Sequence, residues 1–203
     1  GAPTLASWEK LPNPCVRRGY LVSASIYISV YEMCREFIVS KPKDFFTDNW
    51  GMEGEKLSEE YIDDVLRFNK SPLKSSLLWF KEQGAINDQD IDNFDEAREH
   101  RNEIAHNMPM FISDPNHEVN GHIFSSLLEV THKIGVFWIV NYELNLSPDY
   151  DGQEIDESGI QIGTIMMINM MRQIAFGQEP EEGYFYNELK RRAAPNKKKQ
   201  SNT

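Results

Sequence analysis

The chain has 203 residues, of which 40% are hydrophobic and 26% charged, with 12 Gly and 10 Pro. This length and composition are typical of one soluble globular domain and exclude a disordered, collagen-like or disulfide-scaffold chain. The net charge of −11 is unevenly distributed, because residues 189–203 carry six Lys and Arg and no acid, which leaves −17 on residues 1–188. Since general coating of nucleic acid needs a positive field, any nucleic-acid contact of so acidic a body has to be local.

Helix caps and prolines predict a succession of helices along the chain. Most of the predicted helices start at a Ser or Asn cap, several with Pro at the first helical position, and end before a Gly or Pro. The predicted helices are 14–39, 58–69, 72–84, 87 to just before Pro109, 119–146 and 158–177, with a short helical piece after residue 179. The segments 41–57, 109–118 and the acidic stretch up to Glu157 are predicted to be loops.

The alternation of apolar and polar residues that is typical of strands is nearly absent. The sequence therefore predicts an all-α fold, a bundle of about five main helices with a short C-terminal helical piece and a basic tail. We expect a single domain over residues 1–192 and a flexible basic tail over 193–203, where like charges repel and no apolar anchor follows Ala194.

The two cysteines, Cys15 and Cys34, fall in one predicted helix. Nineteen residues of helix separate them by roughly 28 Å, which is beyond disulfide reach. Reduced thiols are typical of the cytoplasm, so we expect a cytoplasmic protein. The apolar stretch 160–176 is too short and too often interrupted by polar residues to span a bilayer, and no membrane partner is expected.

Several familiar motifs are missing, among them the dinucleotide-binding and phosphate-binding glycine loops, paired C-x-x-C cysteines, H-E-x-x-H and G-x-S-x-G. The informative segment is Arg101-Asn102-Glu-Ile-Ala-His106. With Arg, a following Asn, and His five residues after the Arg, it resembles the R-x4–6-H motif of the HEPN superfamily, a group of all-α domains.

The resemblance implies a metal-independent endoribonuclease with a toxin, antiphage or RNA-processing role and no cofactor. It implies His106 as general acid or base, Arg101 as the group that stabilises the phosphate, and Asn102 as the residue that orients them. In the family the site is composite, formed by two motif helices across a homodimer, and an antitoxin protein can be a partner. The alternative is a noncatalytic module of the same fold that binds nucleotides or proteins. The net charge of −17 on residues 1–188 favours this alternative, because it repels RNA.

The residues of the motif can also be interpreted without the family resemblance. Arg101 lies within an apolar arc of its predicted helix, so its guanidinium must pair with a charge or point into a cleft. The structural alternative is an ion pair between Arg101 and Glu32 or Glu36 of the first helix, with His106 an ordinary cation at a helix end.

A second alternative function is a di-iron carboxylate bundle, because Glu103/His106 and Glu129/His132 both fit E-x-x-H. Glu129 and His132 lie away from the predicted buried face, and bridging carboxylates from two further helices are not evident. The sequence therefore predicts no metal site. We expect His100, His117 and His122 to be solvated surface residues.

Overall fold

The computed structural model describes residues 14–47, 57–114, 116–144 and 157–176, and in this part of the chain the ordered elements are all helical. The predicted all-α fold is confirmed. The chain divides into two units, residues 1–166 and 167–203. The boundary expected at residue 192 and the basic tail lie outside the described residues.

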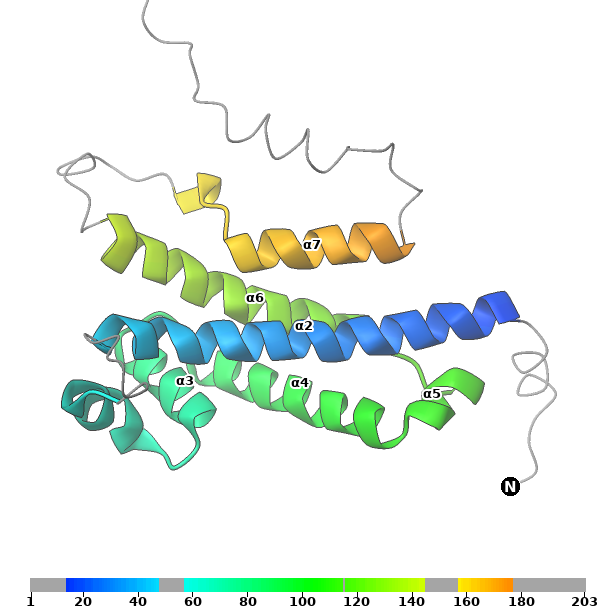
Figure 1. Cartoon of the computed structure of the whole chain (residues 1–203), viewed down its shortest axis with the longest axis horizontal. Coiled ribbons are helices and arrows are strands. Elements are labelled where there is room, and N and C mark those ends of the chain that lie inside the picture. The colour runs from blue at the N-terminus through cyan, green and yellow to red at the C-terminus, as the bar shows by residue number, and fades with distance from the viewer. Residues whose placement is uncertain (1–13, 48–56, 115, 145–156, 177–203) are drawn as a thin grey trace, which may run out of the picture. The chain divides into compact units, whose positions relative to one another are not determined.

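The longest helix of the first unit is α2 (Pro14–Phe46), which runs past α4 (Asp88–His106) and α6 (Gly121–Trp138) (Figure 1). It packs against both of them, and also against α3 (Pro72–Glu82) and the short α5 (Met108–Ser113). The elements η1 (Tyr61–Val65) and η2 (Leu66–Phe68) precede α3, and η3 (Ile139–Leu144) continues α6. The helix α7 (Gly163–Phe176) follows the short turn η5 (Glu157–Gly159) and crosses the boundary between the two units.

Two clusters of side chains fix the helices of the first unit around α2. Near the motif end of α4, the buried residues Ala24, Tyr27, Ile104 and Phe111 pack together. At the C-terminal end of α2, Phe45 and Phe46 make edge contacts with the rings of Trp138 and Trp79. The tight packing of α2 on α4 is reinforced by a hydrogen bond of 3.1 Å from the Tyr27 hydroxyl to the backbone oxygen of Ala97.

The predicted end of the first helix at Val39 is wrong, because α2 continues through Pro42 to Phe46. A proline inside a helix costs about 3 kcal/mol. Here Pro42 is buried, and the helix beyond it places Phe45 and Phe46 in the aromatic cluster. The ring contacts of Phe45 and Phe46 and the burial of Pro42 offset the lost backbone hydrogen bond.

Two further boundaries differ from the prediction. The expected loop 109–118 contains the helix α5, in which Pro109 occupies the first turn and Phe111 is buried. Ser158 does not cap the last helix, which begins at Gly163. The three residues before Gly163 are not helical, and this places the buried side chain of Ile162 against Gly135 of α6.

Both cysteines lie in α2, as predicted, and Cys34 is buried and free. The segment Gly121–Leu144, comprising α6 and η3, is long and apolar enough to cross a membrane by length and composition alone. Its inward residues Leu127, Val130, Ile134 and Trp138 belong to the buried core of the bundle.

Candidate functional site

The motif occupies the last two turns of α4, a helix that is fixed at both ends. At its start, the Asn87 side chain accepts from the Asp90 N–H at 3.1 Å, and the Asp90 carboxylate accepts from the Asn87 N–H at 3.0 Å. At its end, the Asn107 N–H donates to the backbone oxygen of Glu103 at 2.9 Å. This reciprocal cap explains why the helix begins where the sequence predicts, and it sets the register that places the motif.

The Arg101 side chain is held by groups from two helices. One terminal nitrogen, Nη1, donates to the Asn102 side-chain oxygen at 2.8 Å, and the other, Nη2, is paired with Glu32 of α2. Its guanidinium carbon lies 5.5 Å from the centre of the Tyr31 ring. The side chain as a whole is 33% exposed, while its Nε atom is buried and has no hydrogen-bond partner within the described residues. The ion pair with Glu32 that the structural alternative predicts is therefore present, and Asn102 orients the guanidinium.

His106 is the last residue of α4, and its side chain is exposed. Five residues of helix separate it from Arg101, which corresponds to a rotation of about 140° and a rise of about 7.5 Å. Within the described part of the chain, the side chains of Arg101 and Asn102 are hydrogen-bonded, and no side-chain hydrogen bond or ion pair joins His106 to either of them. One copy of the chain therefore presents the cation and the imidazole in different directions.

Charged side chains that sequence reasoning missed surround Arg101. On α2, the Arg35 guanidinium lies 3.5 Å from Glu32, and on α4 the Arg98 guanidinium lies 3.3 Å from Asp95. Burial raises the pKa of Tyr31, while the positive charges of Arg98, Arg101 and Arg35 act against this rise. All three guanidinium groups thus act electrostatically on one tyrosine of α2.

The sequence held a partial signal for this cluster, since Arg98 and Arg101 are one helical turn apart, as are Glu32 and Arg35. It did not show that the two helices would bring both pairs together.

The expectation of solvated surface histidines is wrong for His100, which is buried. Its Nε2 accepts a hydrogen bond of 3.0 Å from the backbone N–H of Asn120, the N-cap residue of α6, and its Nδ1 lies 3.3 Å from the Glu103 carboxylate. The ring also makes an edge contact with Tyr27, with 4.9 Å between centroids. His100 therefore joins α4, α2 and the start of α6.

The other two histidines of that set differ from each other. His122 is exposed, as expected. His117 is partly buried, and its Nδ1 lies 3.3 Å from the Asp114 carboxylate.

The four residues of the two E-x-x-H patterns, Glu103, His106, Glu129 and His132, are all exposed. Glu129 lies 3.2 Å from the Lys133 ammonium group. The described residues contain no group of three or more His, Cys, Asp or Glu side chains placed to hold a metal ion. An inward-facing carboxylate site is thus not supported by the arrangement of this part of the chain.

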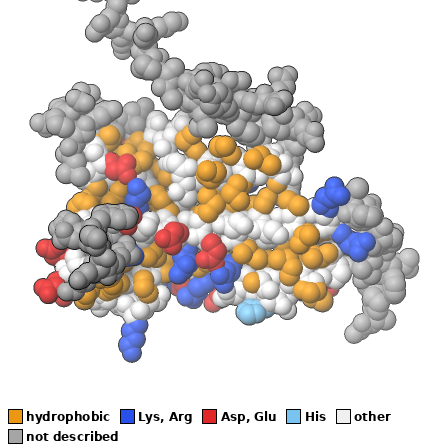
Figure 2. All heavy atoms as spheres, in the orientation of Figure 1, with side chains coloured by type: hydrophobic (Ala, Val, Ile, Leu, Met, Phe, Trp, Pro, Cys, Tyr) orange, Lys and Arg blue, Asp and Glu red, His pale blue; other side chains and the backbone are white. Residues whose placement is uncertain are grey.

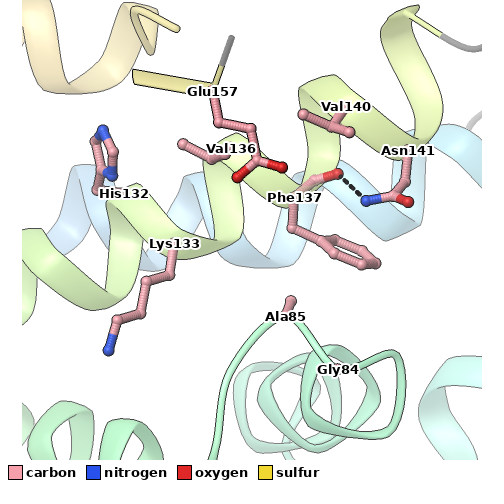
Figure 3. A pocket seen from close by; sticks show the side chains of 9 residues that line it. All are labelled: Gly84, Ala85, His132, Lys133, Val136, Phe137, Val140, Asn141 and Glu157. Carbon is pink, nitrogen blue, oxygen red and sulfur yellow. Dashed lines mark hydrogen bonds between the residues drawn. The ribbon is translucent and has the colours of Figure 1, made fainter. Parts of the chain in front are cut away.

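A hollow of about 480 Å³ lies away from the motif, between α6 with η3, the turn after α3 and the start of η5 (Figure 3). Val136, Phe137 and Val140 give it an apolar wall. Lys133 at its margin is bonded to Asp90 at 2.8 Å, and Asn141 donates to the backbone oxygen of Phe137 at 2.8 Å. His132 and Glu157 also line it. Because Lys133 and Asn141 are engaged within the chain, the motif on α4 remains the candidate site.

Comparison of the chain with known protein families, curated proteins and solved structures finds no match.

Proposed function

We propose that the chain is a metal-independent endoribonuclease of the HEPN type, in which Arg101, Asn102 and His106 act on RNA. The observation that supports this most directly is the arrangement on α4. Arg101 is contacted by Asn102 and its side chain is 33% exposed, and an exposed imidazole follows at the helix end. In the terms of the resemblance, the protein is a cytoplasmic toxin, antiphage or RNA-processing enzyme, and an antitoxin protein is a candidate partner.

The chemistry is transfer of the phosphate ester from the 5′-oxygen to the neighbouring 2′-oxygen. An imidazole removes the proton of the 2′-hydroxyl, the 2′-oxygen attacks phosphorus, and the bond to the 5′-oxygen breaks. A second imidazole donates the proton that this leaving oxygen needs. The products are a 2′,3′-cyclic phosphate and a free 5′-hydroxyl. Arg101 stabilises the negative charge that develops on the phosphate oxygens.

This chemistry requires two copies of the chain. Base and acid act at the same time on opposite oxygens, and each copy supplies one His106. Apolar side chains exposed near the motif end support association: Ala105 on α4, Met110 on α5, and Leu21 on α2, one turn before the buried Ala24. A homodimer that covers these side chains brings two α4 ends together, and with them two imidazoles and two guanidinium groups.

The test is cleavage of a labelled single-stranded RNA in excess chelator. We expect the wild-type chain to cleave, and His106→Ala and Arg101→Ala each to lower the rate by at least about 10²-fold. Asn102→Ala should be milder, since it orients the guanidinium without transferring a proton. His122→Ala, an exposed histidine outside the motif, is the matched control. Cleavage that requires a metal ion, or that His106→Ala leaves unchanged, overturns the proposal.

The second candidate is a noncatalytic module of the same fold that binds nucleotides or proteins. Two observations favour it: the Arg101 guanidinium is already paired with Glu32, and residues 1–188 carry a charge of −17 that repels RNA. Tight binding of a nucleotide or protein without any cleavage of RNA would favour this candidate over the ribonuclease.

A further inference from the structure

Arg101 belongs to a cluster of basic side chains from three helices. The cluster contains Arg35 on α2, Lys74 on α3, and Arg98 and Arg101 on α4. Figure 2 shows basic and acidic side chains gathered on this face of the molecule, with hydrophobic side chains on either side. Such a concentration of cations is unexpected in a chain whose net charge is −11.

The contacts within the cluster join four cations to two carboxylates. Glu32 contacts both Arg35 and Arg101, and Asp95 contacts both Lys74, at 2.6 Å, and Arg98, at 3.3 Å. Each carboxylate is therefore shared, and the contacted groups together carry two positive charges in excess. An anion bound here would complete the pairing.

The other two arginines of the cluster, Arg35 and Arg98, are held weakly. The Arg35 and Arg98 side chains are 48% and 46% exposed, and their ion pairs are long contacts to residues one turn away. Exposed pairs of this kind contribute about 0–1 kcal/mol each. A phosphate, which matches the planar guanidinium with two parallel hydrogen bonds, can replace a carboxylate at such a site at little cost.

We propose that Arg35 and Arg98 bind phosphates of the RNA backbone next to the one held by Arg101, and that Glu32 is the internal counter-ion that the RNA displaces. Three separate guanidinium groups along a helix seam suit a chain of phosphates better than one isolated anion. The proposal rests on the proposed function, and it names residues of substrate binding that lie outside the motif.

The experiment measures the affinity of a labelled single-stranded RNA by fluorescence anisotropy, in full-length chains that carry His106→Ala so that the RNA stays intact. Arg35→Gln and Arg98→Gln should each reduce the salt slope of the binding constant by about 0.7 and weaken binding about four-fold at about 0.15 M salt. Glu32→Gln should tighten binding, because it removes the carboxylate that competes with phosphate for Arg35 and Arg101.

The chain offers matched controls in the exposed ion pair between Arg67 of η2 and Glu82 of α3, whose atoms are 2.7 Å apart. Arg67→Gln and Glu82→Gln make the same changes of charge outside the cluster, so they report the effect of net charge alone. Thermal melts of every variant show whether it is folded, and Arg35→Lys and Arg98→Lys keep the charge where the Gln variants are unstable.

The outcomes separate this inference from the proposed function. Weaker binding by the Arg35 and Arg98 variants, tighter binding by Glu32→Gln and little effect of the controls support it. If wild-type protein cleaves RNA but the Arg35 and Arg98 variants bind like Arg67→Gln, the inference is wrong and the proposed function stands. If wild-type protein neither binds nor cleaves RNA, both are wrong.

Discussion

Arg101 has a place in the fold, and under the proposed function it has a place in the reaction as well. Its pairing with Glu32 links α4 to α2, and its contact with Asn102 fixes the plane of the guanidinium. Both partners are partly exposed, so the pair adds little stability and remains exchangeable. Under the proposed function, the contacts that hold the residue in the free protein also position it to bind phosphate.

His100 acts in the core rather than in the reaction, and its replacement should show this. In His100→Leu, the Asn120 N–H at the start of α6 loses its acceptor, which costs about 1–3 kcal/mol of unfolding free energy. His122→Ala removes an exposed histidine and should change stability by less than about 0.5 kcal/mol. Urea unfolding of both variants measures the difference, and equal stabilities would contradict the structural role of His100.

From the burial of the Cys34 thiol we predict a loss of stability at alkaline pH. Burial raises the pKa of its thiol from 9.0 to about 11. Above pH 9 the unfolded chain loses the thiol proton while the folded chain keeps it, so the free energy of unfolding falls as pH rises, by about 2 kcal/mol up to pH 11. Burial also raises the pKa of Tyr27 and of Tyr61, which acts in the same direction. Cys34→Ala should flatten the decline between pH 9 and 11 in denaturant titrations, and an unchanged decline would rule the thiol out as its source.

At the level of single residues, the sequence could indicate Arg101, Asn102 and His106 because the motif is local. It could also suggest Glu32 as a partner, because an arginine in an apolar arc requires an acid. Burial of His100 and the sharing of Glu32 between Arg35 and Arg101 depend on how α2, α4 and α6 pack, and no local pattern encodes that packing.

Most helix boundaries follow from local chemistry, and three do not. Ser71 caps α3 through the Lys74 N–H, Asn87 caps α4, and Ser58 accepts from the Tyr61 N–H at 3.0 Å, each as the sequence predicts. Three predictions are wrong: the helix end before Pro42, the loop where α5 lies, and the helix start before Gly163. They share one cause. At each place an apolar side chain, the partly buried Phe46 or the buried Phe111 or Ile162, gains enough by packing to override the local signal.

The contact between α6 and Ile162 predicts opposite effects for two Gly→Ala substitutions. A Cβ at Gly135 would lie 2.5 Å from the Ile162 Cδ1 atom and 2.8 Å from its Cγ1 atom, so Gly135→Ala should destabilise the protein by about 1–3 kcal/mol. A Cβ at Gly19 in α2 has no neighbour within 4 Å, and Gly19→Ala should stabilise by about 0.5–1 kcal/mol. Thermal unfolding compares the two, and a stable Gly135→Ala variant would show that Ile162 does not pack on α6 as described.

In the molecule as a whole, the negative net charge acts against the RNA binding that the proposed function requires. Residues 1–188 carry −17, yet the proposed reaction needs a phosphate chain at the seam of α2 and α4. A local excess of cations around Arg101 reconciles the two, because binding is then confined to one face and the remainder of the surface repels RNA. Two copies joined at the ends of α4 would place two such faces beside one pair of imidazoles.

The central claim is that the active species is a pair of chains that share one Arg/His site. Analytical ultracentrifugation and the rate of RNA cleavage, followed over the same range of protein concentration in excess chelator, test it directly. The account predicts that activity per chain rises with the fraction of particles of twice the 23.5 kDa chain mass and disappears as they dissociate. Undiminished cleavage by particles of 23.5 kDa, or a stable dimer that does not cleave RNA, would contradict it.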